Sequence, residues 1–159
     1  MSTPFAFDRS WEFAVTPSEL WATLGRTDRY CEWWPWLREL HVDGDGLRAG
    51  TVAHLVIQAP LPYQLRCSLR VLTAEPDRRL VGEVTGDLAG PARLELEPTD
   101  RGAVVRLVWA LEVKSSLLRP LATIARPALA WAHDRIVERG LAQFEAHAHI
   151  AHQVTEEGK

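Results

Sequence analysis

His133 is the side chain of this sequence best suited to transfer a proton. It lies in a segment whose apolar residues recur mostly at intervals of three and four, which predicts one face of a helix. That face also carries Leu129, Ile136, Val137, Gly140 and Phe144. An imidazole there can bond to a ligand's carbonyl or hydroxyl group, or act on it as an acid or base. The other interpretation is a core histidine bonded to a backbone carbonyl or to Tyr63, and the sequence leaves both open.

Tryptophans provide surfaces on which a ring-shaped ligand can stack. Trp109 falls on the inward face of a predicted strand, where it either stacks on a ring or fills the core. Trp34 and Trp36 belong to the run Trp33-Trp34-Pro35-Trp36, whose three indoles cannot all be buried on one side. We expect one or two of them at a pocket rim and the others packed against a sheet.

Three side chains near the C-terminus have the spacing of metal ligands on a helix. Glu145, His149 and His152 stand at positions i, i+4 and i+7, but on the predicted solvent face and with no second shell in view. Adventitious binding is the most we expect there, so we predict no metal site and no cofactor. The sequence also has no phosphate-binding glycine loop, nucleophile elbow or HExxH motif.

The first two thirds of the chain alternate apolar and polar residues in short runs, which predicts strands. The clearest runs are Phe5–Val15, Thr51–Gln58, Tyr63–Val71, Leu80–Thr85, Ala92–Glu97 and Val105–Val113. The arginines and glutamates of these runs fall on the opposite face, where we expect cross-strand ion pairs.

Helix signals flank these strands. Thr16-Pro17-Ser18-Glu19 predicts a helix start with a capping box, and a second short helix is expected over about 28–33. From Leu117 onward the pattern is helical, which predicts a lead-in helix and then a long amphipathic helix from about Pro127 to Ala151.

A long amphipathic helix after a series of strands usually lies across the concave side of a curved antiparallel sheet. Side chains cannot fill all of the space between the two, so we predict a buried pocket for an apolar small molecule. The residues expected to line it are Trp34, Trp36, Tyr63, Leu65, Cys67, Leu94, Leu107, Trp109, Leu129, His133, Ile136 and Val137.

The entrance is expected where loops are apolar. Three segments qualify: the Trp33–Leu37 turn, the Ala59-Pro60-Leu61-Pro62 hairpin and the Gly86–Pro91 turn. We predict that Pro60-Leu61-Pro62 and Trp36 lie near it, because apolar loop tips suit the entry of an apolar ligand.

Composition restricts the class of protein. The chain has 159 residues, 47% hydrophobic and 25% charged, which fits one globular domain over 1–152 with a loose tail at 153–159. A net charge of −3 without a basic block makes nucleic acid an unexpected partner. The sequence has no apolar run long enough to span a membrane, no signal-peptide pattern and no CxxC pair. We expect a cytoplasmic monomer or weak homodimer with Cys31 and Cys67 reduced.

Several strings resemble a known superfamily. Val15–Trp21, read as VTPSELW, followed by Tyr30–Leu37, read as YCEWWPWL, is similar to the N-terminal signature of the START-like SRPBCC superfamily. Strings farther along resemble its polyketide cyclase/dehydrase-like branch: Gly86-Asp87-Leu88-Ala89-Gly90, Glu97-Pro98-Thr99, Gly102, Trp109, Trp131-Ala132-His133-Asp134 and Gly140-Leu141. Ala132 stands where that branch has Asn, which weakens an activity that depends on the amide.

The resemblance implies an α+β helix-grip fold. Its parts are a seven-stranded curved antiparallel sheet wrapped around a long C-terminal helix, with two short helices after the first strand. Members of the superfamily include lipid and sterol carriers, hormone receptors, aromatase/cyclases and chaperone activators, so the fold alone does not choose a function.

Three functional hypotheses follow. The first is binding of a hydrophobic small molecule, such as an aromatic polyketide, an isoprenoid or a lipid, between the sheet and the C-terminal helix. The second is a cyclase or dehydratase that uses His133 for proton transfer. The third is a protein-interaction module of the chaperone-activator kind, which would need an exposed apolar patch around Trp131 or Trp36.

Overall fold

A computed structural model describes residues 5–58 and 64–114 of the chain. Its strands are β1 (Phe5–Phe13), β2 (Leu37–Asp43), β3 (Val52–Gln58), β4 (Gln64–Glu75), β5 (Arg79–Gly86), β6 (Leu88–Thr99) and β7 (Gly102–Val113). Between β1 and β2 lie the helices α1 (Pro17–Leu24) and α2 (Tyr30–Trp33), with a 3-10 turn, η1 (Thr27–Arg29), joining them.

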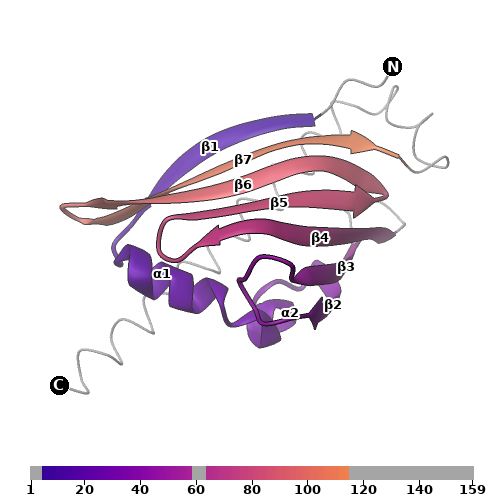
Figure 1. Cartoon of the computed structure of the whole chain (residues 1–159), viewed down its shortest axis with the longest axis horizontal. Coiled ribbons are helices and arrows are strands. Elements are labelled where there is room, and N and C mark those ends of the chain that lie inside the picture. The colour runs from indigo at the N-terminus through magenta and orange to yellow at the C-terminus, as the bar shows by residue number, and fades with distance from the viewer. Residues whose placement is uncertain (1–4, 59–63, 115–159) are drawn as a thin grey trace.

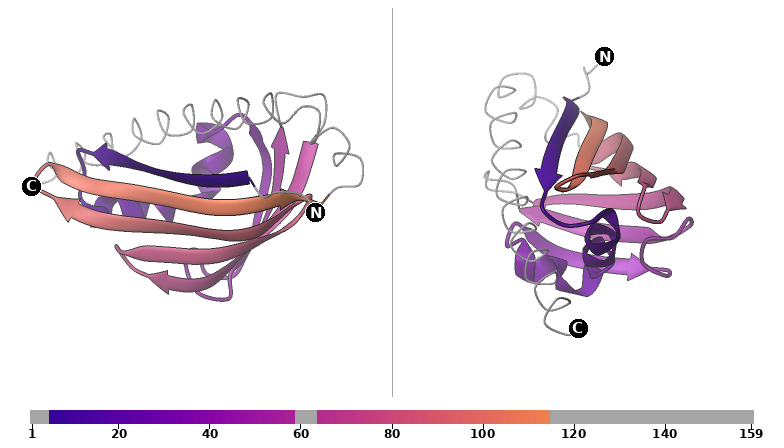
Figure 2. Two further views of the ribbon diagram at one scale, coloured as in Figure 1. Left: turned by 90° about the horizontal axis from the view of Figure 1, so that it is seen from above. Right: turned by 90° about the vertical axis from the view of Figure 1, so that its left-hand side faces the viewer.

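The seven strands form one antiparallel sheet in the order β1-β7-β6-β5-β4-β3-β2 (Figure 1). Each strand from β2 to β7 pairs with its neighbour in sequence, whereas β1 crosses to pair with β7. Figure 2 shows that the sheet is curved and that α1 and α2 lie within its curve. The predicted seven-stranded curved antiparallel sheet with two short helices after the first strand is confirmed.

The alternation read from the sequence sets the two faces of the sheet. We call the face that packs on α1 and α2 the inner face; it carries Phe7, Trp11, Phe13, Leu65, Cys67, Leu94, Leu96, Leu107 and Trp109. The outer face carries Asp8, His41, His54, Arg66, Ser68, Arg93, Glu95 and Arg106. Residues directly opposite in an antiparallel pair share a face, so the register extends this division across all seven strands.

The core fills the angle between the inner face and the helices. It contains Phe13, Val15, Leu20, Trp33, Leu96, Ala103 and Val105. Leu20 is fully buried, and Val15, just before the helix, packs in the same cluster as expected for a hydrophobic staple.

The predicted capping box fixes the start of α1. The Glu19 backbone N–H donates to the Thr16 hydroxyl at 3.2 Å, and the Thr16 N–H donates to the Glu19 carboxylate at 3.1 Å. Pro17 occupies the first turn, where its missing N–H is not needed. The second predicted helix is present but shorter, because its first two residues belong to η1.

The chain path differs from the prediction in two places. None of the runs predicted as strands covers β2, the edge strand next to β3. The Gly86–Pro91 turn is wrong: the chain reverses around Asp87, and Gly90 and Pro91 already lie within β6. The Asp87 backbone N–H donates to the Arg66 carbonyl and its carboxylate accepts the Arg66 N–H, which allows a turn shorter than the sequence indicated.

Several predictions lie outside the described residues. These are the long C-terminal helix, the Ala59–Pro62 hairpin, and the side chains of Tyr63, Leu129, His133, Ile136 and Val137. Within residues 5–58 and 64–114, no helix is long and apolar enough to cross a membrane.

Candidate functional site

An aromatic array occupies the β1–β7 side of the inner face. The register places Phe7 of β1 directly opposite Trp109 of β7, and their rings stack with centroids 4.4 Å apart and planes 15° apart. Trp11 extends the array, with its ring centroid 6.0 Å from that of Phe7. Phe7 is buried and Trp109 is half-buried.

Leucines and one arginine continue this surface. Leu107 lies opposite Leu94 on one side and Arg9 on the other, and both leucines are half-buried. Arg9 interrupts the apolar alternation of β1. Its side chain is exposed, and its guanidinium carbon lies 5.4 Å from the centroid of the Phe7 ring, within the range of a cation–π contact.

A second aromatic cluster forms at α2. Trp34 stacks on Trp36 with centroids 5.7 Å apart and meets Tyr30 edge-on at 4.7 Å. Trp33 is buried in the core, whereas Trp34 and Trp36 are half-buried, which agrees with one indole packing inward and two lying farther out. The Tyr30 hydroxyl donates to the Leu24 carbonyl, and burial raises the pKa of that phenol. The cluster is therefore anchored to the end of α1.

Trp36 lies beside the end of β3, where the described residues stop before the predicted entrance segment. Its backbone carbonyl accepts a hydrogen bond from the Gln58 N–H at 2.7 Å, and Gln58 is the last described residue before that hairpin. The indole Nε1 of Trp36 is buried and has no hydrogen-bond partner in the part of the chain that the structure describes. An unpaired buried N–H is costly, and a ligand acceptor would relieve that cost.

Leu65 and Cys67 extend the inner face along β4. Leu65 lies opposite Ile57, and Cys67 lies between Leu55 and Gly86. Cys67 is buried, and burial raises the pKa of its thiol, so it stays a neutral apolar group. Both cysteines are free, as expected.

The structure therefore brings some of the predicted lining residues onto one face and adds others. Trp109, Leu107, Leu94, Leu65 and Cys67 share the inner face, and Trp34 and Trp36 lie on the segment between α2 and β2. Phe7 and Trp11 had not been proposed as lining residues. Their alternation in β1 was visible, but their place beside Trp109 depends on the pairing of β1 with β7.

Two hollows among the described residues have charged or polar side chains in their lining. One, of about 770 Å³, opens among Glu75, Asp77, Arg78, Arg79, Glu95 and Glu97. The other, of about 420 Å³, lies along β2, β3 and β4, where Glu39, His41, His54, Arg66 and Ser68 contribute to its lining. The apolar aromatic surface is instead on the inner face.

Comparison with protein families gives a match along most of the chain. The model of the family described as "Polyketide cyclase / dehydrase and lipid transport" matches residues 4–149. No curated protein matches the chain in a sequence search.

Solved structures show the same fold at low sequence identity. A conserved protein from Geobacillus kaustophilus has a TM-score of 0.76 and 13% identity, covering 92% of this chain and 97% of that one. The Zhui aromatase/cyclase from Streptomyces sp. R1128 has a TM-score of 0.73 and 12% identity, with 92% and 94% covered. The di-domain aromatase/cyclase StfQ of the steffimycin biosynthetic pathway has a TM-score of 0.72 and 16% identity, covering 92% of this chain and 52% of StfQ.

Proposed function

Because the chain belongs to the polyketide cyclase/dehydrase and lipid transport family, we propose that its inner face binds a hydrophobic small molecule that contains an aromatic or other planar ring. The observation that carries this proposal is the stack of Phe7 on Trp109, whose indole is half-buried. Trp11 and Leu107 continue the same apolar surface along β1 and β7.

The chemistry of this surface favours a planar apolar ligand. Aromatic rings prefer offset-stacked or edge-on neighbours, and each such pair is worth about 0.5–1.5 kcal/mol beyond the area that it buries. An apolar pocket usually has a few polar groups that fix orientation. The buried Trp36 N–H and the Arg9 guanidinium are described polar groups beside the two aromatic clusters.

The other two hypotheses have less support from the described residues. Catalysis with His133 stays a prediction from the sequence, since that residue lies outside them. A chaperone-activator module would need an exposed apolar patch. Among the residues described, Leu72 is the one large apolar side chain that is exposed, at 50%, and Trp36 is half-buried.

Calorimetric titration with a panel of naphthoquinones, anthraquinones, fatty acids and isoprenoids tests the proposal. We expect a ring-containing compound to bind, and Trp109→Ala to weaken it about tenfold, the equivalent of roughly 1.4 kcal/mol. Val108→Ala is the matched control, because Val108 is the preceding residue of β7 and faces outward. Equal affinity for the Trp109→Ala variant and the original protein would place the site elsewhere.

A further inference from the structure

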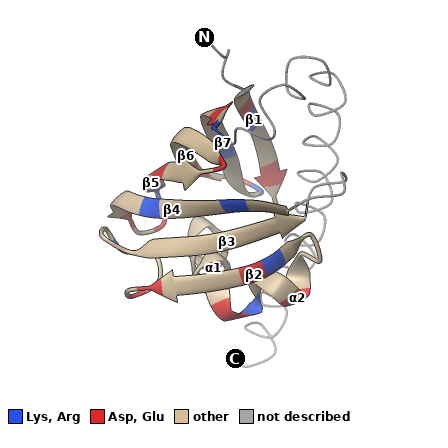
Figure 3. Cartoon of the chain, turned by 90° about the vertical axis from the view of Figure 1, so that its right-hand side faces the viewer, with Lys and Arg blue, Asp and Glu red and all other residues tan. Residues whose placement is uncertain are grey.

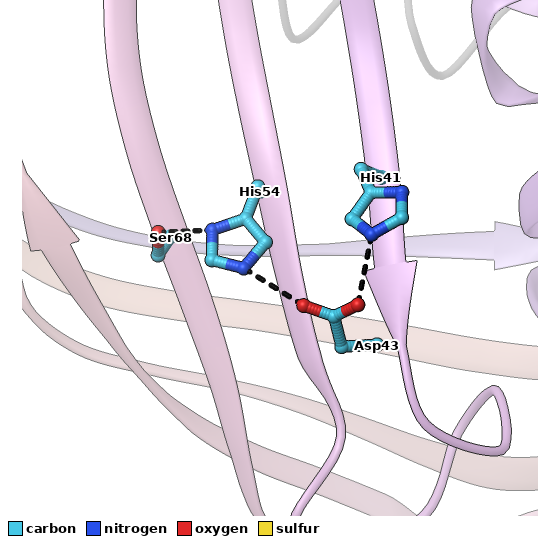
Figure 4. Close-up of polar contacts among 4 residues, drawn as sticks. All are labelled: His41, Asp43, His54 and Ser68. Atoms are coloured by element: carbon cyan, nitrogen blue, oxygen red, sulfur yellow. Dashed lines mark hydrogen bonds and ion pairs between the residues drawn. The ribbon is translucent and has the colours of Figure 1, made fainter.

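A polar cluster joins three strands on the outer face. The Asp43 carboxylate receives His41 Nε2 on one oxygen at 2.8 Å and His54 Nε2 on the other at 3.2 Å (Figure 4). His54 Nδ1 lies 2.9 Å from the Ser68 hydroxyl. The family-based function makes no use of these four residues, because they lie on the face opposite the aromatic array.

We propose that His41, His54 and Asp43 form a binding site for a divalent transition metal of the Zn²⁺ or Cu²⁺ kind. Two imidazoles and one carboxylate are ligands that such ions accept. Both Nε2 atoms already point at one carboxylate, so the donor atoms of all three side chains are gathered in one place. Mg²⁺ and Ca²⁺ prefer all-oxygen sites and are not expected to bind here.

The sheet register produces this gathering. His41 of β2 and His54 of β3 are directly opposite each other, and their rings lie roughly parallel with centroids 6.2 Å apart. Asp43 is two residues beyond His41 and therefore on the same face. It is the last residue of β2, so its carboxylate can turn back toward both imidazoles.

Ser68 supplies an outer partner of the kind that metal-binding histidines usually have. With a neutral imidazole, the Nε2 proton of His54 is donated to Asp43, and Nδ1 accepts from the Ser68 hydroxyl. When Nε2 binds a metal, its proton leaves and solvent returns one to Nδ1, which then donates to the Ser68 oxygen. Each imidazole stays neutral, and the ion and one carboxylate together carry a charge of +1. A ligating histidine held through its second nitrogen is typical of protein metal sites.

The site is not preassembled, so the three side chains must rotate before they can bind one ion. As the side chains lie in the described residues, no group of three or more His, Cys, Asp or Glu could hold a metal ion. Metal–nitrogen bonds of about 2.0–2.1 Å require the imidazoles to move off the carboxylate oxygens. The side chains are 75% exposed for His41, 60% for Asp43 and 49% for His54, which gives them room to rotate and leaves positions open for water.

A nucleophilic role for Ser68 is less well supported. The Ser68–His54–Asp43 chain has the residue types of a serine hydrolase triad, but catalysis of that kind needs donors for an oxyanion. Ser68 lies within β4, which pairs with β3 on one side and β5 on the other. Its neighbouring backbone N–H groups are therefore used by the sheet.

Calorimetric titration of the full-length chain with Zn²⁺ and Cu²⁺ tests the proposal. The C-terminal imidazoles are removed first, as His147→Ala, His149→Ala and His152→Ala together, so that they do not compete. In this background we expect one ion per chain. His41→Ala, His54→Ala or Asp43→Asn should each weaken binding at least about tenfold, and Ser68→Ala less, up to about tenfold. Electron paramagnetic resonance of the Cu²⁺ complex should show coordination by two nitrogens, reduced to one in either histidine variant.

The matched control is Glu83→Gln, which removes an outer-face carboxylate on β5 and should leave metal affinity unchanged. Circular dichroism checks that each variant folds, and His41→Gln and His54→Gln replace any alanine variant that does not. If the histidine variants bind as tightly as the background protein, or if Glu83→Gln weakens binding equally, the proposal is wrong. Ligand binding at the inner face is measured separately and does not depend on this outcome.

Discussion

The two faces of this sheet are built from alternate residues of the same strands and have opposite chemistry. On β4, Cys67 is buried on the inner face, whereas the next residue, Ser68, is part of a hydrogen-bonded polar cluster on the outer face. On β1, Phe7 stacks on Trp109, and the next residue, Asp8, pairs with Arg106. A single register thus assembles an aromatic surface and a polar surface back to back.

The side chains of the outer face interact mainly through exposed ion pairs, which water weakens. Asp8 accepts two hydrogen bonds from Arg106, at 2.6 and 2.8 Å, and Arg93 pairs with Glu95 along β6. Figure 3 shows charges of both signs scattered over the strands. Exposed pairs of this kind contribute little to stability, so we expect the inner face to hold the fold together.

Truncating a core side chain of the inner face should give the largest effect. Phe13 is 3% exposed within the main core, and Phe13→Ala should lower the free energy of unfolding by about 3–5 kcal/mol. Its neighbour Glu12 is exposed, and Glu12→Ala should change it by less than about 0.5 kcal/mol. Urea unfolding of both variants measures these changes in the free energy of unfolding. Equal losses in the two variants would contradict the larger role of the inner face.

Removing the N-cap of α1 should lower the stability by an intermediate amount, because α1 packs on the inner face through Leu20 but the cap itself is exposed. Thr16→Ala deletes the hydroxyl that accepts the Glu19 N–H and should cost about 1 kcal/mol. Thermal unfolding compares it with Ser18→Ala, an exposed position within α1. A Thr16→Ala variant as stable as the Ser18→Ala variant would show that the capping box does not stabilise the helix.

Breaking the outer ion pair should have the smallest effect, and one that depends on pH. The hydrogen bond from Arg106 lowers the pKa of Asp8 below its ordinary 3.8. A lowered folded-state pKa contributes stability above the unfolded pKa, and this contribution is lost as the pH falls through the folded value. Asp8→Asn should therefore be slightly less stable than the original protein at pH 7 and equally stable at the lowest pH at which both remain folded. Denaturant titrations at both pH values, with and without added salt, check this; a pH-independent difference would argue against the ion pair.

Local patterns predicted the parts of the fold that depend on neighbours in sequence. Alternation located most strands, and Thr16 and Glu19 identified the start of α1. The pattern failed at β2, where a register shift between Leu37 and Glu39 interrupts the alternation. It also failed at Gly90 and Pro91, because glycine and proline usually mark a turn, whereas here both lie in strand β6 and pair with β5.

The site was predictable only in part, for a related reason. Trp109 was identified because its own strand reveals its face. Phe7 was not, since its contact with Trp109 requires knowing that the first strand pairs with the last. The cluster around Asp43 was missed in the same way: nothing in the sequence near His41 indicates that His54 lies directly across from it.

The pairing of β1 with β7 also affects how the chain folds during synthesis. Phe13 lies opposite Ala103, so the first strand leaves the ribosome long before its partner exists. At about 5–20 residues per second, the wait lasts on the order of 5 to 20 seconds. Throughout that interval the apolar segment that carries Phe7, Trp11 and Phe13 has no partner strand and can associate with other nascent chains. The strands from β2 onward can form hairpins in order as they emerge, whereas β1 can join the sheet only at β7, in one long-range step.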